Sequence, residues 1–265
     1  MTPPTRPERE FPWWLLIVVA LGAWLFYQVL ADPTYAAVLA TLSKGLAVTV
    51  MVAVVGYAGA CLLGLGLALG VLSHHVWLRQ ACRFYIEVMR GVPIIVLLLY
   101  VAFVLAPMLV ALWNWAAAPF GGDGLRTRDF ALLWRAVLAL VLAYAAFLAE
   151  IFRAGLQAVD PGQIEAAKAL GLTGWQRFRL IVLPQAFRMI LPPLGNDFVA
   201  MVKDSSLVSV LGVGDVTQLA KVTAAGNFKY FETYNVAALI YLTLTIWLSL
   251  LLRRLESRLR LRHSG

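Results

Sequence analysis

Charged residues are scarce in this 265-residue chain: Asp, Glu, Lys and Arg make up 14% of it, whereas 62% is apolar. A soluble domain is typically about a quarter charged, so an ordinary soluble protein is excluded. Disorder is excluded as well, because a disordered chain needs low hydrophobicity and high charge. Cysteine occurs only twice, at Cys61 and Cys82, which excludes a small disulfide-stabilised secreted scaffold.

The apolar residues gather in six runs that can cross a bilayer, whose hydrocarbon core is about 30 Å thick. The runs are 11–30, 45–72, 91–112, 131–149, 192–216 and 235–252. The first is too long for the apolar region of a signal peptide, so we expect it to stay as a membrane span. The sequence therefore predicts an all-α polytopic membrane protein with about six transmembrane helices in one embedded domain.

The basic residues indicate how the chain is oriented. The segments 1–10, 73–91, 150–190 and 253–265 carry 15 of the 22 Lys and Arg residues, and the opposite side carries six. The side richer in Lys and Arg is the cytoplasmic one, so both termini are expected in the cytoplasm. A basic chain can also bind nucleic acid, but these charges flank apolar runs and form no separate basic domain. The external loops are too short to fold into a ligand-binding domain.

Two cytoplasmic segments show helical patterns. Residues 77–90 have an apolar stripe opposite a charged face, which is typical of a helix lying in the membrane interface, either bracing the spans or simply connecting them. In 150–190, Asp160 and Gln163 predict a capping box for a helix that ends before Gly171.

A second capping box, Thr173 with Gln176, begins another helix, and Pro184 is expected to stop it. Two short helices joined at a glycine form either a rigid docking element for another protein or a loop packed on its own spans.

The same segment resembles a known family. Glu165-Ala166-Ala167, Gly171, Leu183 and Pro184 are similar, in type and spacing, to the EAA signature of ABC importer permeases. Five stretches resemble the polar amino-acid branch of that family: Tyr85 to Pro93, Ala149 to Arg153, Gly162 to Glu165, Leu183 to Ala186, and Lys203-Asp204-Ser205-Ser206-Leu207.

The resemblance implies a type I ABC importer permease fold. Its core would be 35–255, preceded by a tail and an extra transmembrane helix in 1–34 and followed by a basic cytoplasmic tail in 256–265. The loop 150–190 would carry a coupling helix that docks on an ATPase. The residues expected at that contact are Gly162, Glu165, Ala166, Ala167, Gly171, Leu183 and Pro184.

The chain lacks the phosphate-binding pattern G-x-x-x-x-G-K-S/T, and it shows no metal-ligand spacing. We therefore expect no cofactor and no catalysis by this chain. ATP and Mg²⁺ would bind to two separate ATPase subunits. The further partners implied are a second permease subunit, identical or homologous, an extracytoplasmic amino-acid-binding protein and the lipid bilayer of a prokaryotic inner membrane.

Charges inside the apolar runs are candidates for the substrate pathway, because a charge at the bilayer centre costs about 2.5–3.5 kcal/mol on insertion scales. Lys203 and Asp204 together offer both signs that a zwitterionic amino acid needs, or they form an internal pair that fixes packing or a gate. The predicted pathway or gate set is Lys203, Asp204, Ser205, Ser206, Asn196 and Glu150. The alternatives are a permease for another small polar solute, a membrane-embedded hydrolase and a passive channel.

Overall fold

A computed structural model describes residues 13–120 and 124–261 of the chain. In this part the chain is helical and contains no β-strand. The predicted tail 1–10, the first two residues of the run 11–30 and the last four residues of the tail 256–265 lie outside the described residues.

Four of the predicted spans are confirmed as helical segments long and apolar enough to cross a membrane. They are Pro33–Val71, Ile94–Ala117, Leu132–Gln157 and Tyr230–Ser257. The first combines α2 (Pro33–Leu42), a 3₁₀ turn and α3 (Leu46–Val71). The second joins α5 (Ile94–Tyr100) to α6 (Ala106–Ala117) through a π-helical stretch, and the other two are α7 (Leu132–Gln157) and α12 (Tyr230–Leu261).

The remaining two predicted spans differ in outcome. The run 11–30 forms α1 (Trp13–Ala31), which ends where Asp32 caps α2. The run 192–216 is not one helix: α10 (Leu183–Asp204) begins nine residues earlier and gives way at Ser205 to a 3₁₀ helix, η6 (Ser205–Leu211). The buried Ser205 hydroxyl donates to the carbonyl of Val202 at 2.7 Å, and the chain turns at Gly212 with φ +75°.

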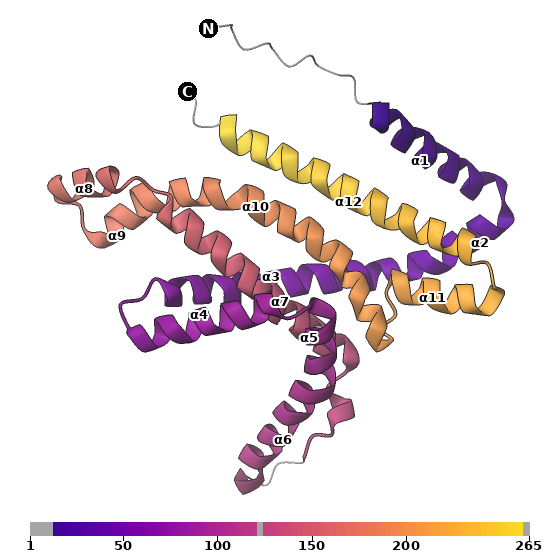
Figure 1. Ribbon diagram of the computed structural model, residues 1–265, viewed down its shortest axis with the longest axis horizontal. Coiled ribbons are helices and arrows are strands. Elements are labelled where there is room, and N and C mark those ends of the chain that lie inside the picture. Colours follow the sequence, from indigo (N-terminus) through magenta and orange to yellow (C-terminus); the bar gives the residue numbers. More distant parts are fainter. Residues whose placement is uncertain (1–12, 121–123, 262–265) are drawn as a thin grey trace, which may run out of the picture.

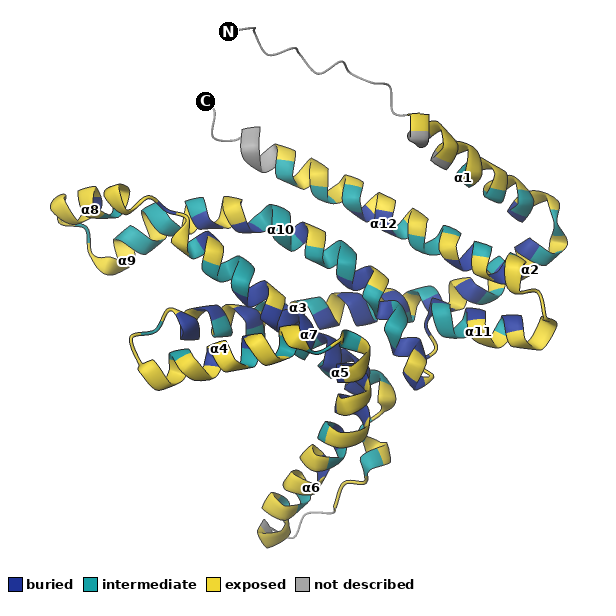
Figure 2. Cartoon of the chain, in the orientation of Figure 1, coloured by how far each residue is buried: buried dark blue, intermediate teal, exposed yellow. Residues whose placement is uncertain are grey.

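α3 and α7 form the centre of the molecule, and Figure 2 shows the buried residues concentrated there. Small residues let the two backbones approach closely. A Cβ added to Gly64 would lie 3.0 Å from the carbonyl oxygen of Ala145, and one added to Gly59 would lie 2.8 Å from Val141. Apolar side chains on the outer surfaces of the spans, such as Leu62, Phe103 and Trp247, are exposed and suit contact with lipid.

The helix predicted at 77–90 is confirmed as α4 (Val76–Gly91). It packs against α3 and α7 and buries Cys82 and Ile86 from its apolar stripe. The Tyr85 hydroxyl donates to the carbonyl of Leu142 at 2.9 Å, which fastens α4 to α7. Burial raises the pKa of Tyr85 to about 12, so this donor keeps its proton at physiological pH.

A helix, α11 (Val216–Asn227), occupies the region expected to be an external loop at 217–234. Its N-cap, Asp215, is buried and accepts hydrogen bonds from the backbone N–H groups of Thr217 and Gln218 and from the Tyr241 hydroxyl. Gly45 lies directly against this cap, and a Cβ there would be 2.6 Å from the carbonyl carbon of Asp215. The N-terminal ends of α3 and α11 and the part of α12 around Tyr241 therefore meet at one tightly packed point.

Candidate functional site

The predicted helix–glycine–helix element projects from one end of the molecule, where Figure 1 shows α8 and α9 farthest from α1 and α2. α8 (Pro161–Ala169) is capped by Asp160, whose carboxylate accepts from the N–H of Gly162 at 2.6 Å. Gly171 has φ +74°, and hydrogen bonds from Gly171 and Leu172 to the carbonyls of Lys168 and Ala167 close the helix end. This part of the prediction is confirmed.

The sequence predicted that the second helix of this element would stop at Pro184, and this prediction is wrong. α9 (Gly174–Arg177), a π-helical stretch at Phe178–Val182 and α10 follow one another without a break. Pro184 stands in the first turn of α10, where its missing N–H costs little because the preceding π-helical turn has already shifted the hydrogen-bond pattern. One continuous helical segment therefore joins the projecting loop to Asp204.

Gln163 does not complete the capping box predicted for α8. Its Oε1 accepts a hydrogen bond from Nε2 of Gln185 at 2.7 Å, which ties α8 to the first turn of α10. The other predicted box is confirmed, with Thr173 and Gln176 bonded in both directions. α8 is thus anchored at both ends, at Gly171 and through Gln185.

The residues expected to contact an ATPase divide by exposure. Ala167 is buried, whereas the others lie on the surface of the projecting element; these are Gly162, Glu165, Ala166, Gly171, Leu183 and Pro184. Glu165 makes no hydrogen bond or ion pair with any described residue. An exposed carboxylate on a rigid, capped helix is available to a partner without rearrangement of the loop.

Lys203 and Asp204 lie at the last turn of α10, where the α-helix changes to η6. The partner of Asp204 is Tyr144 on α7, whose hydroxyl donates to Oδ2 at 2.7 Å. Lys203 is exposed and forms no ion pair with Asp204. The two charged residues therefore have different environments: Asp204 is hydrogen-bonded to α7, whereas Lys203 is exposed.

The other predicted pathway residues lie in three different settings. Ser205 is buried and satisfied by its own helix, Ser206 is half-buried, and Asn196 is exposed two turns earlier on α10. Glu150 stands apart, near the end of α7, where it pairs with Arg153 at 2.6 Å. The structure thus places five of the six residues on α10 and η6, and Glu150 elsewhere.

Two tyrosines that the sequence analysis did not single out complete the polar cluster. The Tyr57 hydroxyl donates to the carbonyl of Leu194 at 2.6 Å, on the same helix as the half-buried Asp197. Asp197 and Asp204 are seven residues apart and so share a face of α10. A tyrosine in the middle of an apolar span, rather than at its ends, is the sequence signal that points to Tyr57 and Tyr144.

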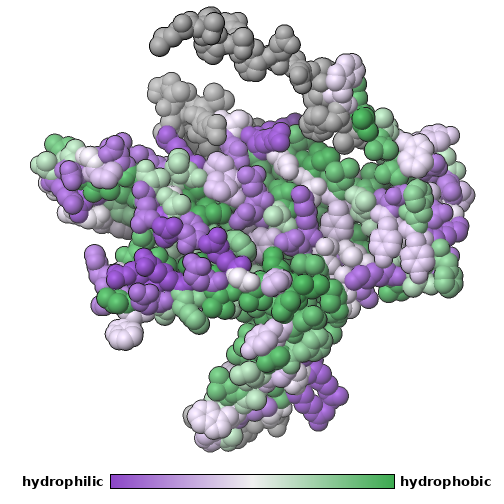
Figure 3. Space-filling model, in the orientation of Figure 1, coloured by the Kyte–Doolittle hydropathy of each residue, from purple (hydrophilic) through white to green (hydrophobic). Residues whose placement is uncertain are grey.

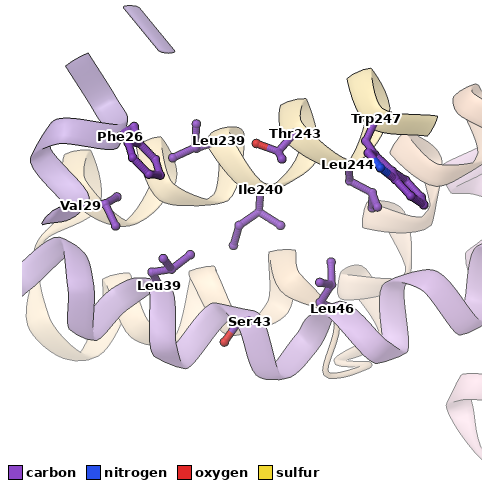
Figure 4. A pocket seen from close by; sticks show the side chains of 10 residues that line it. All are labelled: Phe26, Val29, Leu39, Ser43, Leu46, Leu239, Ile240, Thr243, Leu244 and Trp247. Atoms are coloured by element: carbon purple, nitrogen blue, oxygen red, sulfur yellow. The ribbon is translucent and has the colours of Figure 1, made fainter. Parts of the chain in front are cut away.

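A separate groove of about 470 Å³ lies between α1, α12 and the α2–α3 segment. Figure 4 shows Phe26 and Val29 on one side and Leu39, Leu46 and Trp247 around it. Its lining holds no charged residue and only the hydroxyls of Ser43 and Thr243 as polar groups. The groove suits hydrocarbon and lies apart from the polar cluster.

A multi-pass helical membrane protein with a rigid loop at one end and charges held at a helix end between its spans has the architecture of a transport permease. The chain belongs to the family of binding-protein-dependent transport system inner membrane components, whose model matches residues 60–261. It is accordingly a bacterial inner membrane protein of the amino-acid ABC transporter permeases, with a type I importer fold.

Curated relatives agree with this assignment. The chain is 36% identical to the glutamine transport system permease protein GlnP of Escherichia coli over 225 residues, which cover 83% of the chain and 93% of the relative. It is 34% identical to the arginine transport system permease protein ArtQ of Bacillus subtilis over 82% of the chain and 91% of the relative.

Solved structures agree on the fold. An amino acid ABC transporter crystallised with histidines matches with a TM-score of 0.70 at 35% identity, covering 86% of this chain and 97% of that one. A bacterial ABC transporter that imports alginate matches with a TM-score of 0.66 at 15% identity, covering 92% and 96%. The second match shows the fold alone.

Proposed function

We propose that this chain is the permease subunit of an ATP-driven importer of polar amino acids, such as glutamine or arginine. It forms the pathway with a second permease subunit, identical or homologous, and receives its substrate from an extracytoplasmic binding protein. Two ATPase subunits hold ATP and Mg²⁺ and dock on the loop 150–190. Both termini are cytoplasmic, and this chain itself breaks no bond.

One observation carries this proposal: the exposed loop is continuous with the helix that bears the intramembrane charges. The helical run from Gly174 through Asp204 joins the two regions, and Gln185 fixes α8 to it. Closure of the ATPase subunits against Glu165 and its neighbours would therefore move Asp204 relative to Tyr144. Opening and closing that contact alternately exposes a solute pathway, with Lys203 and Asp204 offering partners of opposite sign for a zwitterion.

The experiment is purification of the tagged chain from its native host in mild detergent, followed by mass spectrometry and by uptake in proteoliposomes. We expect a stoichiometric ATPase, and ATP-dependent uptake of glutamine or arginine but not of a neutral sugar. Glu165→Arg should reduce ATPase recovery at least tenfold, because the loop keeps its fold while its exposed charge is reversed. Glu232→Arg, near the opposite end of the molecule, is the matched control.

Recovery of the intact membrane complex without any ATPase would overturn the proposal. So would an equal loss of ATPase in the two variants, because the contact would then not depend on the loop. Uptake of sugar but not of amino acids would leave the coupling but refute the substrate class.

A further inference from the structure

A polar cavity of about 440 Å³ lies between α4 and α7, away from the polar cluster at Asp204. The C-terminal end of α3, at Val71 and Leu72, closes one side of the cavity. Six polar side chains line it, spaced three or four residues apart on each helix: Arg83, Glu87, Arg90, Glu150, Arg153 and Gln157. Figure 3 shows the hydrophilic surface over α4 beside the apolar surface of α5 and α6.

The α7 side of the cavity is internally satisfied. Arg153 donates to Glu150 through Nε at 3.0 Å and through an Nη at 2.6 Å, and its other Nη donates to Gln157 at 2.7 Å. This arrangement uses three of the five N–H donors of Arg153 and pairs its charge with that of Glu150. The α7 side therefore carries no net charge.

The α4 side is charged and unpaired. Arg83, Glu87 and Arg90 form no hydrogen bond or ion pair with any residue that the structure describes. Arg90 has only the ring of Phe147, 5.9 Å from its guanidinium carbon. The backbone positions of Arg83 and Arg90 are about 10 Å apart along the helix, with Glu87 between them, so the three exposed side chains give the cavity a surplus of one positive charge.

The backbone that carries these three groups is rigid. Cys82 and Ile86 are buried against α3 and α7, and Tyr85 is hydrogen-bonded to Leu142. Because the backbone is fixed, binding of a ligand has to order only the exposed side chains of Arg83, Glu87 and Arg90. A cavity of this volume is also in the range of small-molecule sites, about 300–1,000 Å³.

We infer that this cavity binds a small zwitterion whose anionic group contacts Arg83 and Arg90 and whose ammonium group contacts Glu87. Two sources carry that chemistry: a free amino acid in the cytoplasm and the headgroup of phosphatidylethanolamine. That the cavity opens to the cytoplasm rests on the orientation given under the proposed function. The pairing of the ligand's charges with Arg83, Arg90 and Glu87 is independent of that orientation, because it follows from the residues that line the cavity.

The test is equilibrium binding of radiolabelled glutamine to the purified complex in detergent, without ATP, binding protein or phosphatidylethanolamine. All binding measurements are made on a complex that carries Asp204→Asn, because this substitution weakens binding of glutamine in the proposed pathway. We expect saturable binding that falls at least tenfold in Glu87→Gln and in Arg83→Gln. Arg79→Gln, on α4 but outside the cavity, is the matched control and should bind normally.

N-acetylglutamine lacks the ammonium group and should compete at least tenfold less well than glutamine. O-phosphoethanolamine, a soluble form of the lipid headgroup, distinguishes the sources: stronger competition by it than by glutamine assigns the cavity to lipid. Absence of saturable binding of both glutamine and O-phosphoethanolamine, together with amino-acid import by the parent complex that keeps Asp204, would overturn the inference and leave the proposed function standing. Equal binding of the N-acetylated probe would overturn it too.

Discussion

At the scale of single residues, the contact between Tyr144 and Asp204 shows how an intramembrane charge is held. The carboxylate sits at a helix end, where its neighbours along the chain cannot face it. A hydroxyl from another span supplies the partner at 2.7 Å. Hydrogen bonds to a charged group contribute about 1.5–3 kcal/mol, more than neutral ones, so one hydroxyl stabilises the packing of α7 on α10 appreciably.

Tyr144→Phe removes this hydrogen bond and little else, because the ring remains. We expect a loss of roughly 2 kcal/mol in the free energy of unfolding and a severalfold lower rate of ATP-driven uptake. Thermal unfolding in detergent and proteoliposome uptake measure the two effects. Tyr100→Phe, on the exposed surface of α5, is the control, and equal behaviour of the two variants would remove Tyr144 from the pathway.

Sequence reasoning located Lys203 and Asp204 because charges in apolar runs are conspicuous. It missed Tyr57, Tyr144 and the buried Arg135, whose guanidinium donates to the carbonyls of Ala102, Thr127 and Phe130. Their partners are backbone carbonyls or residues far along the chain, and no local pattern encodes such pairings. Arg135 in particular was counted only as one of the external basic residues.

At the scale of helices and turns, the sequence predicted those helix ends whose hydrogen-bond partners lie close by in the chain. The cap at Asp160, the left-handed Gly171 and the box at Thr173 all depend on residues within four positions, and all three are confirmed. Pro184 did not end the helix because it stands in the first turn of α10, where the missing N–H costs little. The π-helical stretch before it, which has no clear sequence signature, lets the helix continue.

Two glycines of the segment Pro33–Val71 differ in how closely other atoms approach them, so one can serve as the control for the other. Gly45→Ala places a methyl group 2.6 Å from the backbone of Asp215 and Val216, so we expect roughly 2–3 kcal/mol of destabilisation. Gly66→Ala meets nothing within 4 Å and should be neutral or slightly stabilising. Thermal unfolding of the two variants in one detergent compares them, and equal midpoints would contradict the packing at Gly45.

At the scale of the whole molecule, the sequence predicted the helical class and four of the spans, because the apolar runs are long and few charges interrupt them. The family was predicted from the resemblance of the motifs around Glu165 and Lys203. Hydropathy did not show where the run 192–216 changes from α to 3₁₀, because both parts of the run are apolar. Nor could it predict the cavity between α4 and α7, because that depends on how two helices distant in sequence cross.

The first helix is the part of the molecule that the rest depends on least. α1 packs mainly on α2 and α12, and the family match begins after it, at residue 60. Deletion of residues 1–31 should leave the remaining helices in their present orientation, because the bias of Lys and Arg across the membrane persists. The new N-terminus should then lie outside the cell, and ATPase recovery should stay within about twofold of the full chain.

Protease protection of an N-terminal tag in spheroplasts measures the first expectation, and co-purification measures the second. A cytoplasmic tag with the ATPase lost would mean that α1 sets the orientation of the whole chain.

The unbroken run from Gly174 to Asp204 has a mechanical consequence. At 1.5 Å per residue its path is about 45 Å long, and it bends along the way (Figure 1). A rotation of the whole segment by about 5° around one end would displace the other end by about 4 Å. That displacement exceeds the length of the hydrogen bond between Tyr144 and Asp204. A small rotation of the projecting end is therefore enough to break this contact when the bends hold their shape. The stiffness of the segment at its π-helical stretch and at Pro192 and Pro193 determines how much of each rotation is transmitted.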